Sequence, residues 1–175
     1  DLMNIAIVDD DAEAIKRIEA PLFEVSKSRG LDLTVKEFDN TSGFLESYRQ
    51  GIYDMVFLDI YIDDSTGLDL AKKIRSNDAG CMIIFATTSV ENMPEAFRFH
   101  AFDYIIKPVE SERVISVFTD ALGVMPDMNR YMTFIAERQE IKLLFTDCVC
   151  AVTSGHYLII QAKSGEEYRV RMSLK

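Results

Sequence analysis

The segment that decides the fold is Asn4–Asp11, which reads NIAIVDDD. Its first part, NIAIV, is a short apolar run of the kind found in strands that are buried on both faces of a parallel sheet. The run stops at three aspartates, Asp9, Asp10 and Asp11. Ligands of an open parallel sheet bind beyond the carboxyl ends of its strands, so these acids are candidate site residues.

Outward from this segment, strand-like runs alternate with helical patterns. Further strands are predicted at 31–38, 54–58, 81–86 and 103–106, and helices at 12–29, 41–50, 67–75, 91–100 and 110–122. Parallel strands need crossover connections, and right-handed helical crossovers cover both faces of the sheet. The sequence therefore predicts an α/β fold with a doubly wound, five-stranded parallel sheet.

The pattern changes after residue 124. Residues 125–130 (MPDMNR) are rich in turn-forming side chains and are expected to be a linker. Strand-like runs follow at 131–136, 141–145, 149–152, 157–162 and 168–172, with turns at Ser154-Gly155 and Ser164-Gly165. They predict a small antiparallel β meander. We therefore expect one domain over residues 1–124 and a second, smaller one over 131–175.

Charge is distributed unevenly along the 175 residues, whose net charge is −10. Residues 1–124 hold 23 acidic and 12 basic side chains, whereas residues 125–175 hold 6 acidic and 7 basic ones. The first part lacks the basic face that sequence-independent binding to a phosphate backbone requires. If the chain contacts nucleic acid, the second part is where to look.

Other features of the composition point to a cytoplasmic protein. Three cysteines, an odd number, fit a reducing compartment better than a disulfide scaffold. No apolar run reaches the roughly 18 residues of a membrane span. The early acids argue against a signal or transit peptide, and Met3, preceded by Asp1 and Leu2, has the look of a natural start.

The candidate site gathers residues from four strand ends. Asp9 and Asp10 follow the first strand, Asp59 the third, Thr87 the fourth and Lys107 the fifth. Two carboxylates 4 Å apart repel by roughly 4 kcal/mol at an effective dielectric constant of 20. They stay ionised together only if a cation shares the site, and oxygen ligands that keep waters suit Mg²⁺.

These motifs resemble the receiver domain of two-component response regulators over about residues 3–124. The matching stretches are Ile7–Asp11, Phe57–Asp59 with Gly67 eight residues on, Ile84–Thr87, and Phe102–Pro108. The resemblance implies a flavodoxin-like fold in which Asp59 accepts a phosphoryl group. It also implies that Asp9, Asp10, Asp59 and the backbone carbonyl of Tyr61 hold Mg²⁺.

The same resemblance assigns roles to three other residues. Lys107 would pair with a phosphoryl oxygen, Thr87 would hydrogen-bond another, and Tyr104 would be the switch aromatic; the Lys107-Pro108 bond would be cis. Structural alternatives stay open for each. The three early aspartates could simply complement a helix dipole, Thr88 competes with Thr87, and Tyr104 could fill the core.

One departure from the family lies after the candidate phosphoacceptor. A proline is common four residues after that position, but this chain has Asp63. We expect a loop there that is more acidic and more flexible than usual. Tyr61 and Ser89 stand where they could gate the attack of water, and so set the lifetime of the phosphoryl bond.

The tail resembles the start of a LytTR-type DNA-binding domain. The matching stretches are 141–144, 147–152, 153–157 and 167–174. By this resemblance His156 lies in a loop that enters the major groove, and Arg169 and Arg171 share one strand face that meets phosphates. About half of such a domain is present, so we expect it to be truncated or reduced. Cys148 and Cys150 would share one strand face and serve in packing.

The leading hypothesis is a response regulator that is phosphorylated by a sensor histidine kinase and whose parent protein binds promoter DNA. It would not turn over substrate. Two other classes remain: an aspartyl-phosphate phosphatase of the haloacid-dehalogenase type, and a pseudo-receiver that only mediates protein contacts. Half a β domain would leave strand edges unpaired, so we expect a homodimer formed by the tails.

Overall fold

The computed structural model describes residues 2–63, 65–125, 131–136, 139–144 and 147–171. The chain divides into two compact units, residues 1–124 and residues 125–175. None of the described helices is long and apolar enough to cross a membrane.

The first unit is built around one parallel sheet. Its strands are β1 (Leu2–Val8), β2 (Asp32–Phe38), β3 (Met55–Leu58), β6 (Met82–Thr87) and β7 (Asp103–Ile106), in the order β2-β1-β3-β6-β7. Its helices are α1 (Ala12–Arg29), α2 (Thr41–Ser47), α3 (Gly67–Asn77), α4 (Met93–Arg98) and α5 (Ser111–Val124). All neighbouring strands of this sheet are parallel. The predicted doubly wound sheet is confirmed.

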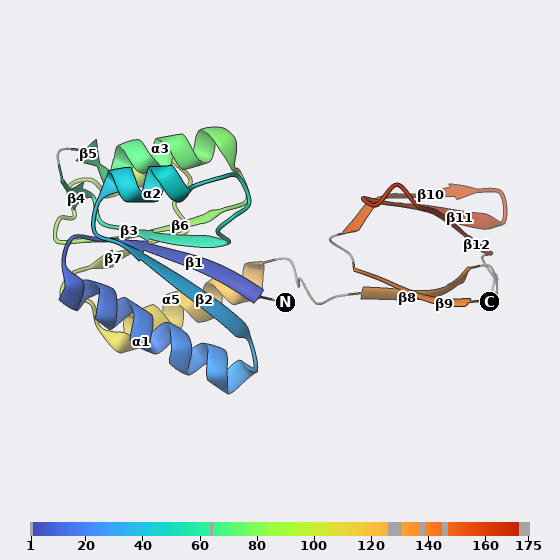
Figure 1. The fold of residues 1–175 in the computed structure, drawn as a ribbon, viewed down its shortest axis with the longest axis horizontal. Helices are drawn as coiled ribbons and strands as arrows, with labels where there is room; N and C mark the ends of the chain where they lie inside the picture. The colour runs from blue at the N-terminus through green and yellow to red at the C-terminus, as the bar shows by residue number, and fades with distance from the viewer. Residues whose placement is uncertain (1, 64, 126–130, 137–138, 145–146, 172–175) are drawn as a thin grey trace. The chain divides into compact units, whose positions relative to one another are not determined.

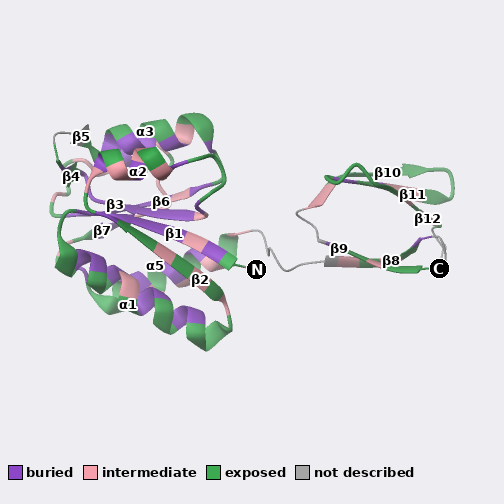
Figure 2. Cartoon of the chain, viewed as in Figure 1, coloured by how far each residue is buried: buried purple, intermediate pink, exposed green. Residues whose placement is uncertain are grey.

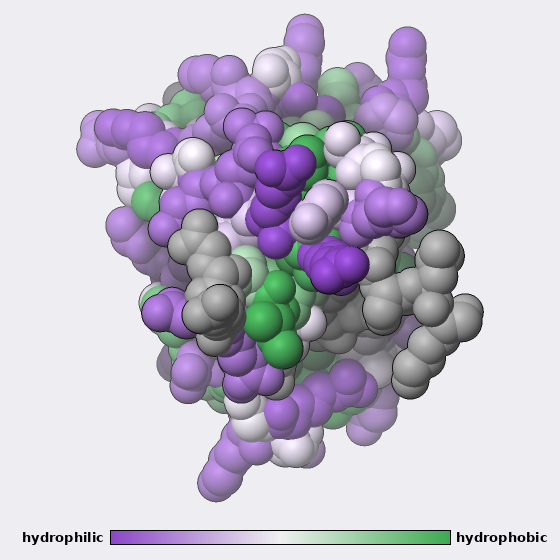
Figure 3. Space-filling model, turned by 90° about the vertical axis from the view of Figure 1, so that its right-hand side faces the viewer, coloured by the Kyte–Doolittle hydropathy of each residue, from purple (hydrophilic) through white to green (hydrophobic). Residues whose placement is uncertain are grey.

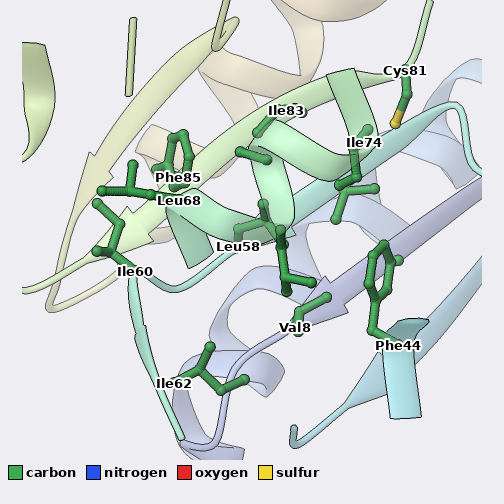
Figure 4. Packing of buried hydrophobic residues seen from close by; sticks show 14 of the residues in the cluster. Val8, Phe44, Leu58, Ile60, Ile62, Leu68, Ile74, Cys81, Ile83 and Phe85 are labelled. Carbon is green, nitrogen blue, oxygen red and sulfur yellow. The ribbon is translucent and has the colours of Figure 1, made fainter. Parts of the chain in front are cut away.

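Helices cover both faces of the sheet: α2 and α3 lie over one face, and α1 packs beside α5 over the other (Figure 1). The central strands β1, β3 and β6 are therefore almost entirely buried (Figure 2). On the α3 side, Leu58, Ile74 and Phe85 belong to one apolar cluster (Figure 4). This double burial explains why these strands are continuous apolar runs in the sequence.

A short hairpin that the sequence did not predict follows Asp59. Strand β4 (Tyr61–Ile62) pairs with β5 (Ser65–Thr66) in antiparallel orientation. Asp63, at its turn, has φ +47°, a left-handed conformation that aspartate tolerates better than most residues. The strands on either side of this turn are therefore paired, an arrangement that the sequence did not indicate.

Helix α4 is shorter than the predicted 91–100. It begins at Met93, with Pro94 in its first turn, and ends at Arg98. Pro94 favours a helix start, because its fixed φ suits the first turn and its missing N–H would have no partner there. His100 has φ +53°, which no right-handed helix can continue through. These two residues limit the helix at both ends.

Arg75, near the end of α3, binds five backbone carbonyl oxygens at the amino edge of the sheet. Its guanidinium donates to Asp78 O, Ala79 O and Cys81 O at 2.9–3.0 Å, to Phe99 O at 3.0 Å and to His100 O at 3.3 Å. A planar guanidinium carries five N–H donors, which suits it to such a cluster. The residues that follow α4 are thereby bonded to the turn between α3 and β6.

The second unit consists of two antiparallel sheets. A hairpin pairs β8 (Tyr131–Ala136) with β9 (Gln139–Leu144), and a meander joins β10 (Cys148–Ser154), β11 (Tyr157–Ala162) and β12 (Glu167–Arg171). The antiparallel strands are confirmed, but they do not form a single sheet. Leu143 of the hairpin packs against Ile160 and Ala162 of the meander, so two layers enclose a small core that one sheet could not.

Several apolar side chains of the second unit remain exposed. Ile135, Val149 and Val152 keep 68%, 60% and 52% of their surface accessible. The face presented in Figure 3 likewise carries apolar surface among hydrophilic side chains. Leu143 and Ile160, by contrast, are buried within the unit itself.

Candidate functional site

The carboxyl ends of the parallel strands bring the predicted site residues to one edge of the sheet. Asp9 follows β1, Asp59 follows β3, Thr87 ends β6 and Lys107 follows β7. The Lys107 ammonium donates to Asp59 Oδ2 at 2.6 Å and to Asp9 Oδ1 at 2.9 Å. The Lys107-Pro108 bond that follows is cis. Residues nearly 100 positions apart thus meet in one buried ion cluster.

Three carboxylates are close enough to share a cation. Asp9, Asp10 and Asp59 each offer an oxygen, and these oxygens lie within 4.8 Å of one another. Asp9 and Asp59 are 1% and 6% exposed, while Asp10 is open to solvent. Asp9 Oδ2 is buried and accepts no hydrogen bond from the described residues, although the ammonium lies 2.8 Å away. An oxygen-only cluster of three carboxylates with one open side fits Mg²⁺.

The burial of this cluster shifts its proton equilibria. Burial lowers the pKa of Lys107, but its hydrogen bonds to Asp59 and Asp9 outweigh that effect and leave the pKa raised. Burial raises the pKa of Asp9, against the opposing effect of its bonds to Lys107 and to the Asp11 backbone. The ammonium is therefore firmly charged and serves as the fixed cation of the site.

Asp11 has a role distinct from that of its two neighbours. Its side chain accepts a hydrogen bond from Glu13 N–H at 2.9 Å and caps α1. Its own N–H donates to Asp9 Oδ1 at 2.9 Å. The helix-capping alternative thus describes Asp11, whereas Asp9 belongs to the ion cluster with Lys107 and Asp59.

Thr87 and Tyr104 occupy the neighbouring strands β6 and β7. Thr87 is fully buried, and its Oγ1 has no hydrogen-bond partner among the described residues. The Tyr104 ring is buried, with its centroid 6.1 Å from that of Phe85, and its hydroxyl donates to Ser89 O. Burial also raises the pKa of Tyr104. The buried ring agrees with the core-filling alternative, whereas the role of Tyr104 as switch aromatic stays a prediction.

Tyr61 connects the site to the start of α4. Its N–H donates to Asp59 Oδ1 at 3.1 Å, and its hydroxyl accepts from Asn92 Nδ2 at 2.8 Å. Its side chain is 53% exposed. The sequence indicated two roles for Tyr61, the carbonyl ligand and the gating of water, but not its link to Asn92. That link joins residues 31 positions apart and left no local signal.

Gly67 is required by close contact. A Cβ atom on Gly67 would lie 2.0 Å from Asp59 O, so any larger residue would collide with the backbone of the candidate phosphoacceptor. Its N–H also donates to Ile60 O at 2.9 Å. The spacing of eight residues between Asp59 and Gly67 therefore has a steric origin.

The second unit carries the residues predicted to contact DNA. His156 is exposed in the two-residue turn between β10 and β11, after Gly155 with φ +60°. Arg169 and Arg171 are exposed on the same face of β12, and the Arg169 guanidinium lies 4.9 Å from the centre of the Tyr157 ring. The exposed turn and the alternating arginines lie as the sequence indicated. The last three residues of that match, 172–174, lie outside the described part.

The cysteines divide into different environments. Cys81 is buried, and burial raises the pKa of its thiol to about 12. A register shift lies between Cys148 and Cys150, so the two do not alternate regularly along β10. Cys148 packs against the small core, while Cys150 is exposed. The prediction of packing is therefore wrong for Cys150, because the bulge turns it out of the core.

Comparisons with known proteins agree with this geometry. A family model described as the response regulator receiver domain matches residues 5–119. The sensory transduction protein LytR of Staphylococcus haemolyticus is 39% identical over 112 residues, which cover 64% of this chain and 42% of that protein. The sensory transduction protein LytT of Enterococcus faecalis is 32% identical over 119 residues, covering 68% and 48%. The matches span less than half of either relative.

Solved structures share the fold. The response regulatory domain of protein mrkE from Klebsiella pneumoniae is 28% identical with a TM-score of 0.59, over 70% of this chain and 98% of that one. The response regulator DrrB of Thermotoga maritima is 20% identical with a TM-score of 0.61, over 100% and 68%, a likeness of fold alone.

Proposed function

The chain belongs to the response regulator receiver family, and from this membership we propose that it is a phosphorylation-switched regulator of a two-component system. Asp59 accepts the phosphoryl group from a sensor histidine kinase. The observation that carries the proposal is the bridge from Lys107 to Asp59 and Asp9, at 2.6 and 2.9 Å, beside the open carboxylate of Asp10. A carboxylate nucleophile, a fixed ammonium and a cluster of metal-binding oxygens are the parts that phosphoryl transfer needs.

In the proposed reaction, an Asp59 carboxylate oxygen attacks the phosphorus of the phosphohistidine. A P–O bond forms as the P–N bond breaks, and the histidine keeps the electron pair and takes up a proton. Lys107, freed from its bond to Asp59 Oδ2, pairs with a phosphoryl oxygen. The buried Thr87 hydroxyl, which has no hydrogen-bond partner among the described residues, is suited to donate to another phosphoryl oxygen.

The residues Asp9, Asp10 and Asp59, with the backbone carbonyl of Tyr61, would hold Mg²⁺. When bound, the ion supplies positive charge that neutralises the phosphoryl oxygens during transfer. The carboxylate oxygens of Asp9, Asp10 and Asp59, which lie within 4.8 Å of one another, support this assignment. No residue in these roles needs to leave its strand end to reach the site.

Signal transmission would pass from Thr87 to Tyr104 and α4. Tyr104 is held by its bond to Ser89 O, two residues beyond Thr87. A shift of Thr87 toward a phosphoryl group would move that carbonyl and release the ring. We therefore assign Tyr104 as the switch aromatic of residues 1–124, the receiver domain.

The second unit is proposed to be the start of a LytTR-type output domain that acts on promoter DNA in the parent protein. Relatives named LytR and LytT support this assignment. His156, Arg169 and Arg171 are the candidate DNA contacts, and residues 125–130 join the two domains. We place the protein in the cytoplasm, as a signalling protein without substrate turnover.

The phosphorylation assignment is tested with a small phosphodonor such as phosphoramidate and Mg²⁺. Intact-mass spectrometry should show one adduct of about 80 Da on the full chain. Asp59→Asn should give none and should keep the fold, since an amide cannot form an acyl phosphate. Asp54→Asn is the matched control, because Asp54 lies at the other end of β3 and its contact to Asn4 N–H can persist.

The same assay separates the competing functions. Steady release of phosphate without an adduct would indicate a phosphatase of the haloacid-dehalogenase type. No adduct and no release would indicate a pseudo-receiver. Persistent labelling of Asp59→Asn, or loss of the adduct in Asp54→Asn, would move the phosphoacceptor away from Asp59.

A further inference from the structure

Asp63 bonds the loop that follows the phosphoacceptor to the start of α2. Its carboxylate accepts from Thr41 N–H at 2.7 Å and from Thr41 Oγ1 at 2.9 and 3.1 Å. Thr41 is only 4% exposed, so these charge-assisted bonds are made against a buried residue of a helix. Local sequence gives no signal for this contact, because the two residues are 22 positions apart.

The backbone at Asp63 is specific for this contact. Its φ of +47° is open to Asp, Asn and Gly but closed to proline, whose ring fixes φ near −65°. The proline that is common at this position in receivers therefore could not adopt the conformation seen here. This chain replaces a rigid residue with one that bonds to a neighbouring helix.

Asp63 and the candidate site are both bonded to the chain where β2 ends and α2 begins. Asp9 N–H donates to Phe38 O at 2.9 Å; Phe38 ends β2, three residues before Thr41 begins α2. Tyr61, two residues before Asp63, donates its N–H to Asp59 Oδ1. Thus Asp9, which follows β1, and Asp63, which follows β4, are both bonded to the short segment 38–41.

We propose that Asp63 is a positioning residue that sets the Tyr61 carbonyl relative to Asp9, and so sets the affinity of the site for Mg²⁺. The inference rests on the proposed function, since it concerns the same cation site. Asp63 acts through the loop backbone and is not itself a ligand. Breaking its bonds to Thr41 would let the loop move and would leave one ligand of the cation unplaced.

A simple electrostatic explanation makes a different prediction. If Asp63 attracted Mg²⁺ only by its charge, any neutral substitution would weaken binding equally. If Asp63 acts by position, Asn should substitute for it, since Asn tolerates the left-handed conformation and keeps an acceptor for Thr41 N–H. Thr41→Val should then weaken binding although it leaves every charge in place.

The experiment measures Mg²⁺ binding to the full chain by isothermal titration calorimetry. Asp63→Ala should raise the Kd about fivefold and Thr41→Val about twofold, while Asp63→Asn should stay within about twofold of wild type. Glu46→Gln, which removes an exposed charge from the same helix α2, should leave the Kd unchanged. Amide exchange at Tyr61 should quicken in Asp63→Ala and Thr41→Val only.

The outcomes distinguish the proposed Mg²⁺ site from the positioning role of Asp63. Absence of Mg²⁺ binding by wild type would overturn the proposed site and this inference with it. Binding by wild type with an unchanged Kd in Asp63→Ala would overturn the positioning role alone. Suppose instead that Asp63→Asn and Asp63→Ala weaken Mg²⁺ binding equally and Thr41→Val leaves it unchanged. That result would show that the charge of Asp63, and not its position, sets the affinity.

Discussion

At the scale of single residues, the lack of a side chain at Gly67 lets α3 start against the backbone of Asp59. A Cβ atom there would lie 2.0 Å from Asp59 O and 2.9 Å from the carbonyl carbon. The obstacle is backbone, which cannot rotate away as a side chain can. Any added atom must displace the end of β3 or the start of α3, and either movement reaches the candidate phosphoacceptor.

Gly67→Ala is therefore expected to lower the free energy of unfolding by about 1–3 kcal/mol, the usual range for overpacking. Urea denaturation would measure the change. Gly123→Ala in α5 is the matched control, since a Cβ there meets nothing within 4 Å and alanine favours the helix. Equal stability of Gly67→Ala and wild type would show that the contact relaxes freely.

Lys107 neutralises two buried carboxylates in the metal-free protein. Removal of one member of a buried ion cluster leaves uncompensated charge, so Lys107→Ala should be destabilised by about 3 kcal/mol in EDTA. Added Mg²⁺ should restore more stability to this variant than to wild type, since the cation takes over the lost charge. Thermal melts with and without Mg²⁺ test this, with the exposed Lys72→Ala on α3 as control. A larger Mg²⁺ effect in wild type would contradict it.

The sequence predicted which residues meet at the site, but not how the loop around them is held. Strand ends of a parallel sheet share one edge, so Asp9, Asp59 and Lys107 could be brought together from their positions alone. The bonds of Asp63 to Thr41 depend on a left-handed turn residue. Such a conformation is decided by tertiary contacts, and the sequence showed only an unusual aspartate.

At the scale of elements, α1 and β2 carry a pair of like charges. Burial raises the pKa of Glu19 above its ordinary 4.5, and Glu37 raises it further by repulsion and by a hydrogen bond. A carboxyl group with a raised native pKa binds its proton more tightly in the folded state. Its contribution to stability is therefore present at low pH and is lost as pH rises from the unfolded pKa through the native pKa.

Glu37→Gln should remove the repulsion and reduce that loss. At pH 7 the variant is expected to be more stable than wild type by roughly 0.2–1 kcal/mol, and the difference should vanish near pH 4. Thermal unfolding across this pH range is the measurement. Glu24→Gln, an exposed substitution on α1, is the control and should leave the dependence of stability on pH unchanged. A difference in stability between Glu37→Gln and wild type that persists at pH 4 would contradict repulsion between Glu19 and Glu37.

The identity of the elements was predictable, while some of their ends were not. Apolar periodicity distinguishes buried strands from amphipathic helices, so the parallel sheet and its crossovers follow from the pattern. Helix α4 fell short because Pro94 and the left-handed His100 limit it. The hairpin β4–β5 was missed because two-residue strands carry no period.

At the scale of the whole molecule, the two units differ in how completely they bury their apolar residues. The first unit encloses large side chains such as Phe57, Phe85 and Phe118 completely. The second unit buries Leu143 and Ile160 but exposes Ile135, Val149 and Val152. Exposed apolar side chains beside an unpaired strand edge favour association with another chain.

Deletion of residues 125–175 should therefore leave a cooperatively folded monomer, while the full chain sediments as a dimer. Analytical ultracentrifugation would compare the two, and circular dichroism would show that the parallel sheet and its helices persist. Val152→Lys in the full chain should weaken the dimer without unfolding it, because the side chain is already exposed. A monomeric full chain at micromolar concentration would contradict the proposed homodimer.

The division of the second unit into two sheets could not be predicted from the sequence. Alternating patterns identify strands but do not specify which strands pair, since hairpins and layered sheets show the same period of two. In the structure, Leu143 of the hairpin packs against Ile160 and Ala162 of the meander and is not paired with that sheet. Only the three-dimensional contacts show that the hairpin packs against the meander and does not hydrogen-bond to it as a further strand pair.

Two of the carbonyl bonds of Arg75, to Phe99 O and His100 O, make α4 a lever that is fixed at its carboxyl end. At its amino end, Asn92 makes no side-chain cap bond among the described residues and instead donates to the Tyr61 hydroxyl at the surface. Phosphorylation of Asp59 should then swing α4 about Phe99. We expect amide chemical-shift changes on phosphorylation to be largest at Asn92 and to diminish toward His100, and Arg75→Gln to spread them evenly along the helix.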